Sequence, residues 1–153
     1  MPNLYEIFDL LKSTQPEYQV VADAVARLRE AIQAHQADMP PNTSLRDYEA
    51  AGNKLEATYT VRLWAEFEAA LRSYRRFVTA NPHDQIRARD LIDWAQGVEA
   101  GRRVDNRMRD LIHEVRVYRN SLVHEREEIV PAVGIGEARH RLSTYLAKLP
   151  ERW

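Results

Sequence analysis

The sequence predicts an all-α protein: an antiparallel bundle of four main helices with one short extra helix. Apolar residues recur every three or four positions along almost the whole chain, and the alternation typical of β-strands is absent. Glycine is scarce, at 5 of 153 residues, and the connections between the expected helices are short, which implies antiparallel neighbours. This length supports one hydrophobic core, so we expect a single domain over residues 1–153.

The first two expected helices form an N-terminal extension, residues 1–43. A short helix is expected at Leu4–Lys12, and a second begins near Pro16, because proline fits the first turn of a helix better than its interior. The second helix ends before Pro40. Its apolar face carries Val21, Val25, Leu28 and Ile32.

The core bundle is expected at residues 44–149 and begins with a long helix. Ser44 is suited to cap this helix, and Asp47 stands three residues later, as in a capping box. Asn81 and Pro82 end the helix. Its apolar stripe consists of Leu55, Tyr59, Leu63, Phe67, Leu71 and Tyr74.

Three further helices complete the expected bundle. Asp84 is placed to cap the first of them, and Gly101 to end it. The next runs from about Val104 to Glu128, and the last spans Glu137–Leu149.

Composition excludes several classes of protein. The formal net charge is -1, so no overall field draws the chain onto nucleic acid, and we expect no DNA partner. Cysteine is absent, which excludes disulfides, thiolate metal sites and cysteine nucleophiles. No apolar run approaches a membrane span, and the first residues lack a signal-peptide pattern. We therefore expect a cytoplasmic protein without a membrane partner.

The most informative segment lies late in the helix expected at 104–128. Arg119, Asn120 and His124 place a permanent cation, an amide and an imidazole within six residues. A guanidinium is suited to holding a phosphate, and a histidine can transfer a proton at neutral pH. These are the groups that RNA cleavage without a metal requires.

Helical geometry adds a condition to this interpretation. Asn120 and His124 are four residues apart and would share a face of a regular helix. Arg119 and His124 are five apart, about 140° around the axis, so one ideal helix does not bring them together. Two copies facing each other could form a joint cleft, and we therefore expect a homodimer.

The segment Arg119-Asn120-Ser121-Leu122-Val123-His124 resembles the motif of the HEPN superfamily, a group of compact helical bundles. The resemblance implies a metal-independent endoribonuclease that needs no cofactor and acts as a dimer, as in toxin–antitoxin or phage-defence systems. It implies that His124 is the general acid and base, that Arg119 stabilises the charged phosphorane, and that Asn120 orients the pair. The expected products are a 2′,3′-cyclic phosphate and a 5′-hydroxyl.

The same resemblance leaves alternatives open. Family members silenced by nucleotidylation carry a tyrosine two residues after the histidine, where this chain has Arg126, so we do not expect that control. An antitoxin or neighbouring protein is a candidate partner. Other members keep the fold without nuclease activity, and a catalytically silent module that binds protein or RNA is therefore the alternative function.

Local charge favours RNA as a partner. Residues 102–126 hold seven arginines and four carboxylates, a net charge of +3 beside the motif. Arg109, Arg116 and Arg126 are the expected RNA-binding residues. The alternative is a solvated helix face with intrahelical ion pairs such as Glu114 with Arg107.

A metal centre is the competing interpretation of the histidines. Asp110 with His113, and Glu137 with His140, each place a carboxylate and an imidazole three residues apart on one helical face. Such a site needs further inward carboxylates, for which Glu66 and Glu68 are the donors available. The helical positions of Glu66 and Glu68 relative to the apolar stripe place at least one of these side chains on the outside of the bundle. We therefore expect no metal.

Overall fold

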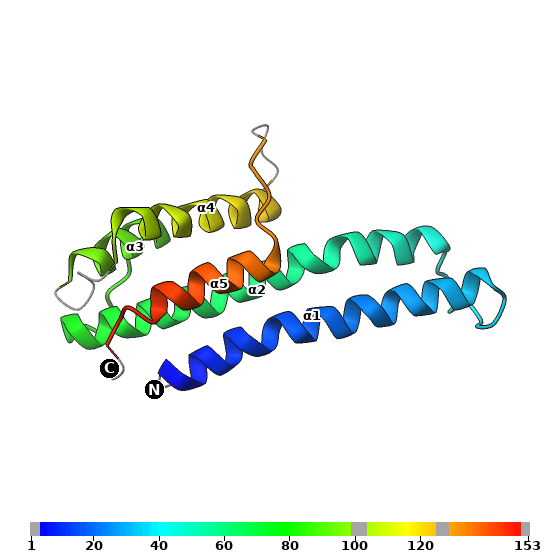
Figure 1. The fold of residues 1–153 in the computed structure, drawn as a ribbon, viewed down its shortest axis with the longest axis horizontal. Coiled ribbons are helices and arrows are strands. Elements are labelled where there is room, and N and C mark those ends of the chain that lie inside the picture. The colour runs from blue at the N-terminus through cyan, green and yellow to red at the C-terminus, as the bar shows by residue number, and fades with distance from the viewer. Residues whose placement is uncertain (1–3, 99–103, 125–128, 151–153) are drawn as a thin grey trace.

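The structure is a computed structural model that describes residues 4–98, 104–124 and 129–150. These residues form five helices and no strand, which confirms the all-α class (Figure 1). In chain order they are α1 Leu4–Gln33, α2 Leu45–Thr79, α3 Ala88–Gly97, α4 Asn106–Val123 and α5 Ile135–Leu146.

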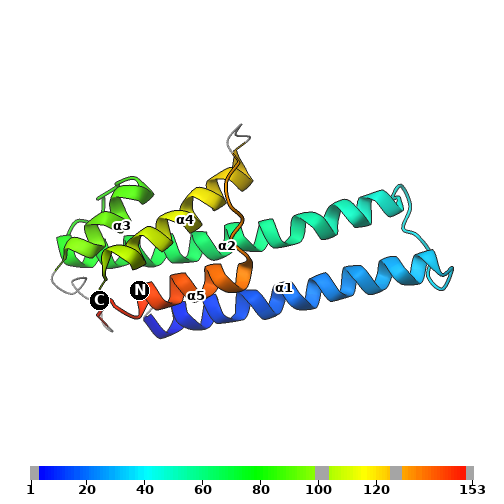
Figure 2. The same ribbon diagram turned by 45° about the horizontal axis from the view of Figure 1, so that its top comes forward.

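The two long helices, α1 and α2, lie side by side as an antiparallel pair (Figure 1). The shorter helices gather over one half of this pair: α5 packs on both α1 and α2, α4 packs on α2 and α5, and α3 packs on α2 and α4. At the other end the pair projects as a two-helix arm beyond the shorter helices, as Figure 2 also shows. The core therefore occupies only part of the length of the molecule.

The buried residues of α2 show where that core begins. All of them lie at or after Thr60, and none lies in the arm. Phe67 is fully buried and contacts both Trp64 and Tyr145, with ring centroids 5.4 and 5.7 Å apart. The N-terminal helix joins the same core through Ile7 and Leu11.

The prediction of two helices before residue 33 is wrong, because α1 continues through Pro16. Proline has no N–H group to donate and its ring crowds the preceding turn, so this position weakens the helix. The hydroxyl groups of Ser13 and Thr14 both donate to the Leu10 carbonyl, at 3.0 and 2.9 Å. Thr14 and Leu11 are fully buried just before the proline, so packing against the other helices holds the chain helical there.

The expected cap of the long helix is confirmed. The Asp47 carboxylate accepts hydrogen bonds from the backbone N–H and the hydroxyl of Ser44, both at 2.7 Å. These two hydrogen bonds lower the pKa of Asp47. α2 begins at Leu45, directly after this cap.

The ends of the later helices differ from the prediction. Asp84 does not cap α3, which begins four residues later with Arg87 as its N-cap; Asp84 forms an ion pair with Arg75 instead, at 2.6 Å. Gly101 lies outside the described residues. α4 begins after Asp105, whose carboxylate accepts from the Met108 N–H at 2.7 Å. α4 ends at Val123, before the expected boundary, and α5 begins two residues and ends three residues before the predicted limits.

Replacing Pro16 with alanine tests the continuity of α1. We expect the Pro16→Ala protein to gain about 1 to 2 kcal/mol in unfolding free energy, since proline inside a helix costs about 3 kcal/mol and its removal also frees the unfolded chain. Urea unfolding followed by circular dichroism measures this gain. Gln19→Ala, at an exposed position of the same helix, is the matched control. An unchanged or lower stability for Pro16→Ala would mean that a helix starts at the proline.

Candidate functional site

The predicted motif lies at the C-terminal end of α4. Arg119 and Asn120 are half-buried in the last turns of the helix, whereas His124 is exposed and follows the final helical residue. The backbone of His124 is extended, with φ -117° and ψ 128°, and its N–H donates to the Asn120 carbonyl at 3.0 Å. The expectation that Asn120 and His124 share a helical face is therefore wrong, because the helix ends between them.

Arg119 and Asn120 form a direct contact. One terminal nitrogen of the Arg119 guanidinium donates to the Asn120 side-chain oxygen at 3.1 Å. The Nε of Arg119 is buried and has no hydrogen-bond partner among the described residues. A buried donor without a partner is costly unless something satisfies it. The guanidinium is thus held by Asn120 and keeps an unused donor.

Neighbouring residues fix this end of α4 to the rest of the protein. Tyr118 is half-buried against the core, and burial raises the pKa of its phenol, with a further contribution from the nearby Glu56 carboxylate. The same carboxylate accepts the backbone N–H of Ile135, the first residue of α5, at 2.9 Å. Glu56 of α2 thereby fixes the start of α5, near Tyr118 of α4.

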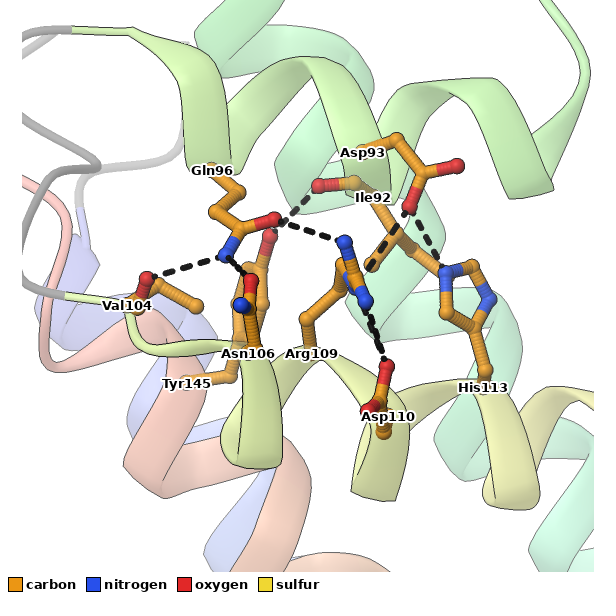
Figure 3. A network of polar contacts seen from close by, with 9 residues as sticks. All are labelled: Ile92, Asp93, Gln96, Val104, Asn106, Arg109, Asp110, His113 and Tyr145. Carbon is orange, nitrogen blue, oxygen red and sulfur yellow. Dashed lines mark hydrogen bonds and ion pairs between the residues drawn. The ribbon is translucent and has the colours of Figure 1, made fainter.

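A second group of polar residues lies along α4, closer to its start. Arg109, His113, Arg116 and Asn120 follow one another at i, i+4, i+7 and i+11, so they share one face of the helix. Figure 3 shows how the first two of these side chains meet α3. A polar stripe therefore leads along α4 to the motif.

Arg109, an expected RNA-binding residue, is already engaged by protein groups. Its guanidinium bonds to Asp110 at 2.8 and 3.1 Å and to the Gln96 side chain at 3.3 Å, and it lies 4.0 Å from Asp93 (Figure 3). The hydrogen bond to Asp110 is the main reason that the pKa of Arg109 is raised. The head group of Arg109 is therefore fixed in position between α3 and α4.

His113 pairs with a residue from another helix. Its Nε2 lies 2.8 Å from the Asp93 carboxylate of α3, and its Nδ1 is buried without a hydrogen-bond partner among the described residues (Figure 3). Sequence spacing had grouped His113 with Asp110 on the same helix. An aspartate twenty residues earlier gives no periodic signal of this contact, so sequence reasoning missed it.

The carboxylates of the alternative metal centre bind arginines instead. Glu137 pairs with Arg141 at 2.6 Å, and Glu68 pairs with Arg72 at 2.6 Å. Arg141 also binds Glu114 at 2.6 Å. The described part of the chain contains no group of three or more histidines and carboxylates that could hold a metal ion.

Two depressions flank His113. One, of about 320 Å³, is lined by Arg89, Asp93, Arg109, Asp110, His113 and Arg116. It brings Arg109 and Arg116, both expected to bind RNA, to one surface and adds Arg89, which sequence reasoning did not single out. The other, of about 580 Å³, lies between α4 and the segment 130–133 and has mainly apolar walls. Arg126, the third expected RNA-binding residue, lies outside the described residues.

Comparisons with protein-family models, with curated proteins and with solved structures give no match to this chain. The resemblance of Arg119–His124 to the HEPN motif therefore stays a prediction from the sequence. Among the described residues, no helix combines the length and the apolar composition needed to cross a membrane.

Tyr145 provides a pH-dependent test of how α5 is fixed to α3. It is fully buried, its hydroxyl donates to the Ile92 carbonyl at 2.9 Å, and burial raises its pKa, with a smaller contribution from Asp93. A phenol whose pKa is raised by folding stabilises the protein below its unfolded pKa of about 10. This stability is lost as the pH rises from there toward the folded pKa.

We expect Tyr145→Phe to cost about 1 kcal/mol at neutral pH, through the lost hydrogen bond, and to weaken the decline of stability above about pH 10. Urea unfolding at neutral and alkaline pH measures both effects. Tyr5→Phe, at an exposed position, serves as the control. If Tyr145→Phe and the wild type lose stability equally in alkali, then Tyr145 does not stay protonated in the folded state.

Proposed function

We propose that this chain is a metal-independent endoribonuclease of HEPN type, with Arg119, Asn120 and His124 as its catalytic residues. The observation that carries the proposal is the Arg119–Asn120 hydrogen bond next to an exposed His124. A guanidinium with an unused donor, an amide that holds it and an accessible imidazole are the groups that this reaction needs.

In the proposed reaction the ribose 2′-oxygen attacks the adjacent phosphorus, and the bond from phosphorus to the 5′-oxygen breaks. His124 takes the proton from the 2′-hydroxyl or supplies one to the departing 5′-oxygen. Arg119 stabilises the negative charge that develops on the phosphoryl oxygens, and Asn120 keeps the guanidinium oriented. The products are a 2′,3′-cyclic phosphate and a 5′-hydroxyl.

This reaction moves two protons, which favours two histidines in one cleft. One protomer supplies a single motif histidine, so we propose a homodimer in which the partner supplies the second. Large apolar side chains are exposed near His124 in the chain: Val123, directly before it, is 47% exposed, and Ile129, five residues after it, is 99% exposed. Exposed apolar residues beside a site are typical of protein contacts, with a second copy or with an antitoxin.

An enzyme that acts on RNA in this way is expected in the cytoplasm.

The alternative is a catalytically silent HEPN-like module that binds protein or RNA. One observation favours it: His124 is joined to Asn120 through its backbone N–H, which donates to the Asn120 carbonyl. Its side chain lies beyond the helix end, where the helix does not hold it toward Arg119. Cleavage assays separate the two functions.

Purified protein should cleave a labelled RNA of mixed sequence in the presence of EDTA. We expect His124→Ala and Arg119→Ala to lower the rate by a factor of about 100 or more, because general acid–base catalysis and charge stabilisation each contribute at that scale. Asn120→Ala should have a smaller effect, since Asn120 acts through Arg119. His140→Ala, at an exposed histidine of α5, should retain the wild-type rate.

The chemical ends of the RNA fragments and the oligomeric state of the protein complete the test. Cyclic-phosphate ends produced by wild type and His140→Ala alone would support the nuclease. Equal cleavage by all variants would mean a contaminating enzyme or another site. A folded wild-type dimer that leaves RNA intact would favour the silent binding module.

A further inference from the structure

A third depression, of about 650 Å³, lies where α2 ends and α3 begins. Its polar walls are dominated by arginines, Arg72, Arg76 and Arg87, with Asp84 as the one carboxylate in the lining. No sequence pattern marks this surface as a site. Its residues come from both sides of the connection between the two helices.

The ion pairs within this depression leave two of its arginines available. Arg72 is bound to Glu68 at 2.6 Å, and Asp84 is bound to Arg75 at 2.6 Å. Arg76 and Arg87 are exposed, and neither has a carboxylate partner among the described residues. Two uncompensated guanidinium groups in one concave surface favour an anionic ligand, and their planar donors match phosphate oxygens.

Ion pairs and hydrogen bonds fix the segment that lines the depression. The Arg75–Asp84 pair is largely buried, at 17% and 15% side-chain exposure, and Arg75 also lies over the Trp94 ring of α3 at 4.7 Å. Arg72 donates to the Ile86 carbonyl at 3.0 Å and so ties the connection to α2. A ligand there would meet a surface that is already ordered, which lowers the entropic cost of binding.

The start of α3 contributes residues both to this surface and to the polar depression on α4. Arg87 and Arg89 are two residues apart at the start of α3, and Arg89 lines the depression that also contains Arg109 and Arg116. The stripe then continues along α4 through Asn120, whose side chain holds Arg119. Basic groups therefore occur at the end of α2, in the first turn of α3 and along α4, with Asp93 and Asp110 between them in the depression on α4.

We propose that Arg76 and Arg87 bind backbone phosphates of the RNA strand whose scissile bond lies at Arg119 and His124. The strand would run along α4, cross the first turn of α3 and end in the depression at the end of α2. This inference rests on the proposed function for the identity of the ligand, single-stranded RNA. The contacts are to phosphates and would fix the position of the strand without selecting its sequence.

Binding measurements in the His124→Ala background test this path without cleavage. The probe is a fluorescent single-stranded RNA of about 20 nucleotides, and anisotropy gives its dissociation constant between about 50 and 300 mM salt. The test variant is Arg76→Ala/Arg87→Ala. The control, Arg29→Ala/Arg46→Ala, removes the same charge from the arm; Arg46 lies about 45 Å along α2 from Arg76.

We expect the test variant to bind RNA roughly 10- to 30-fold more weakly near 0.1 M salt. Its slope of log affinity against log salt should fall by about 1.4, or about 0.7 for each lost phosphate contact. The control should change the affinity by less than about twofold, since it alters only the net charge. Thermal melting should be unchanged in both, because the substituted arginines make no ion pair among the described residues.

The outcomes separate this inference from the proposed function. Equal weakening in the test and control variants would overturn the RNA path, even if wild type cleaves RNA. Absence of RNA binding at the lowest salt would also overturn it and would favour a protein ligand for the depression. If only the test variant binds RNA more weakly, and the wild type does not cleave RNA, the RNA path is supported and the proposed nuclease function is overturned.

Discussion

Burial of one face of α2, from Thr60 to Tyr74, holds the helices together. Each of the other four helices packs against α2. Aromatic contacts link this face to its neighbours: Phe67 contacts Tyr145 of α5, and Tyr74 contacts Trp94 of α3, with ring centroids 5.7 Å apart in both pairs. Loss of this face would remove a packing contact from every other helix, since each of them packs against α2.

Polar contacts between helices then set the positions that packing alone leaves open. The Tyr145 hydroxyl joins α5 to the Ile92 carbonyl of α3, and His113 joins α4 to Asp93 of α3. Glu56 connects α2 with the first residue of α5, close to Tyr118. Hydrogen bonds of this kind contribute modestly to stability but restrict how the helices rotate and slide. The end of α4, where the motif lies, is therefore positioned from several sides.

The charge distribution depends on pairing more than on composition. The chain is nearly neutral overall, yet some of its carboxylates pair with arginines of another part of the fold, as in Arg75–Asp84 and Arg141–Glu114. Arg76 and Arg87 have no such partner in the part of the chain that the structure describes, and they give their surface a local positive charge. A protein without excess basic charge can in this way present a surface suited to phosphates.

The all-α class, the Ser44–Asp47 cap and the apolar face of α2 could be predicted from the sequence, because periodicity and capping depend on residues a few positions apart. The face predicted for the end of α1 is less buried than expected, since Leu28 is 41% exposed. The sequence also supplied the motif on which the proposed function rests. The continuation of α1 through Pro16 depends on tertiary packing, because burial of Leu11 and Thr14 outweighs the local cost of proline. The same holds for the Asp93–His113 pair and for the arginine-lined depression after α2, since their residues meet only when separate helices pack at a particular rotation.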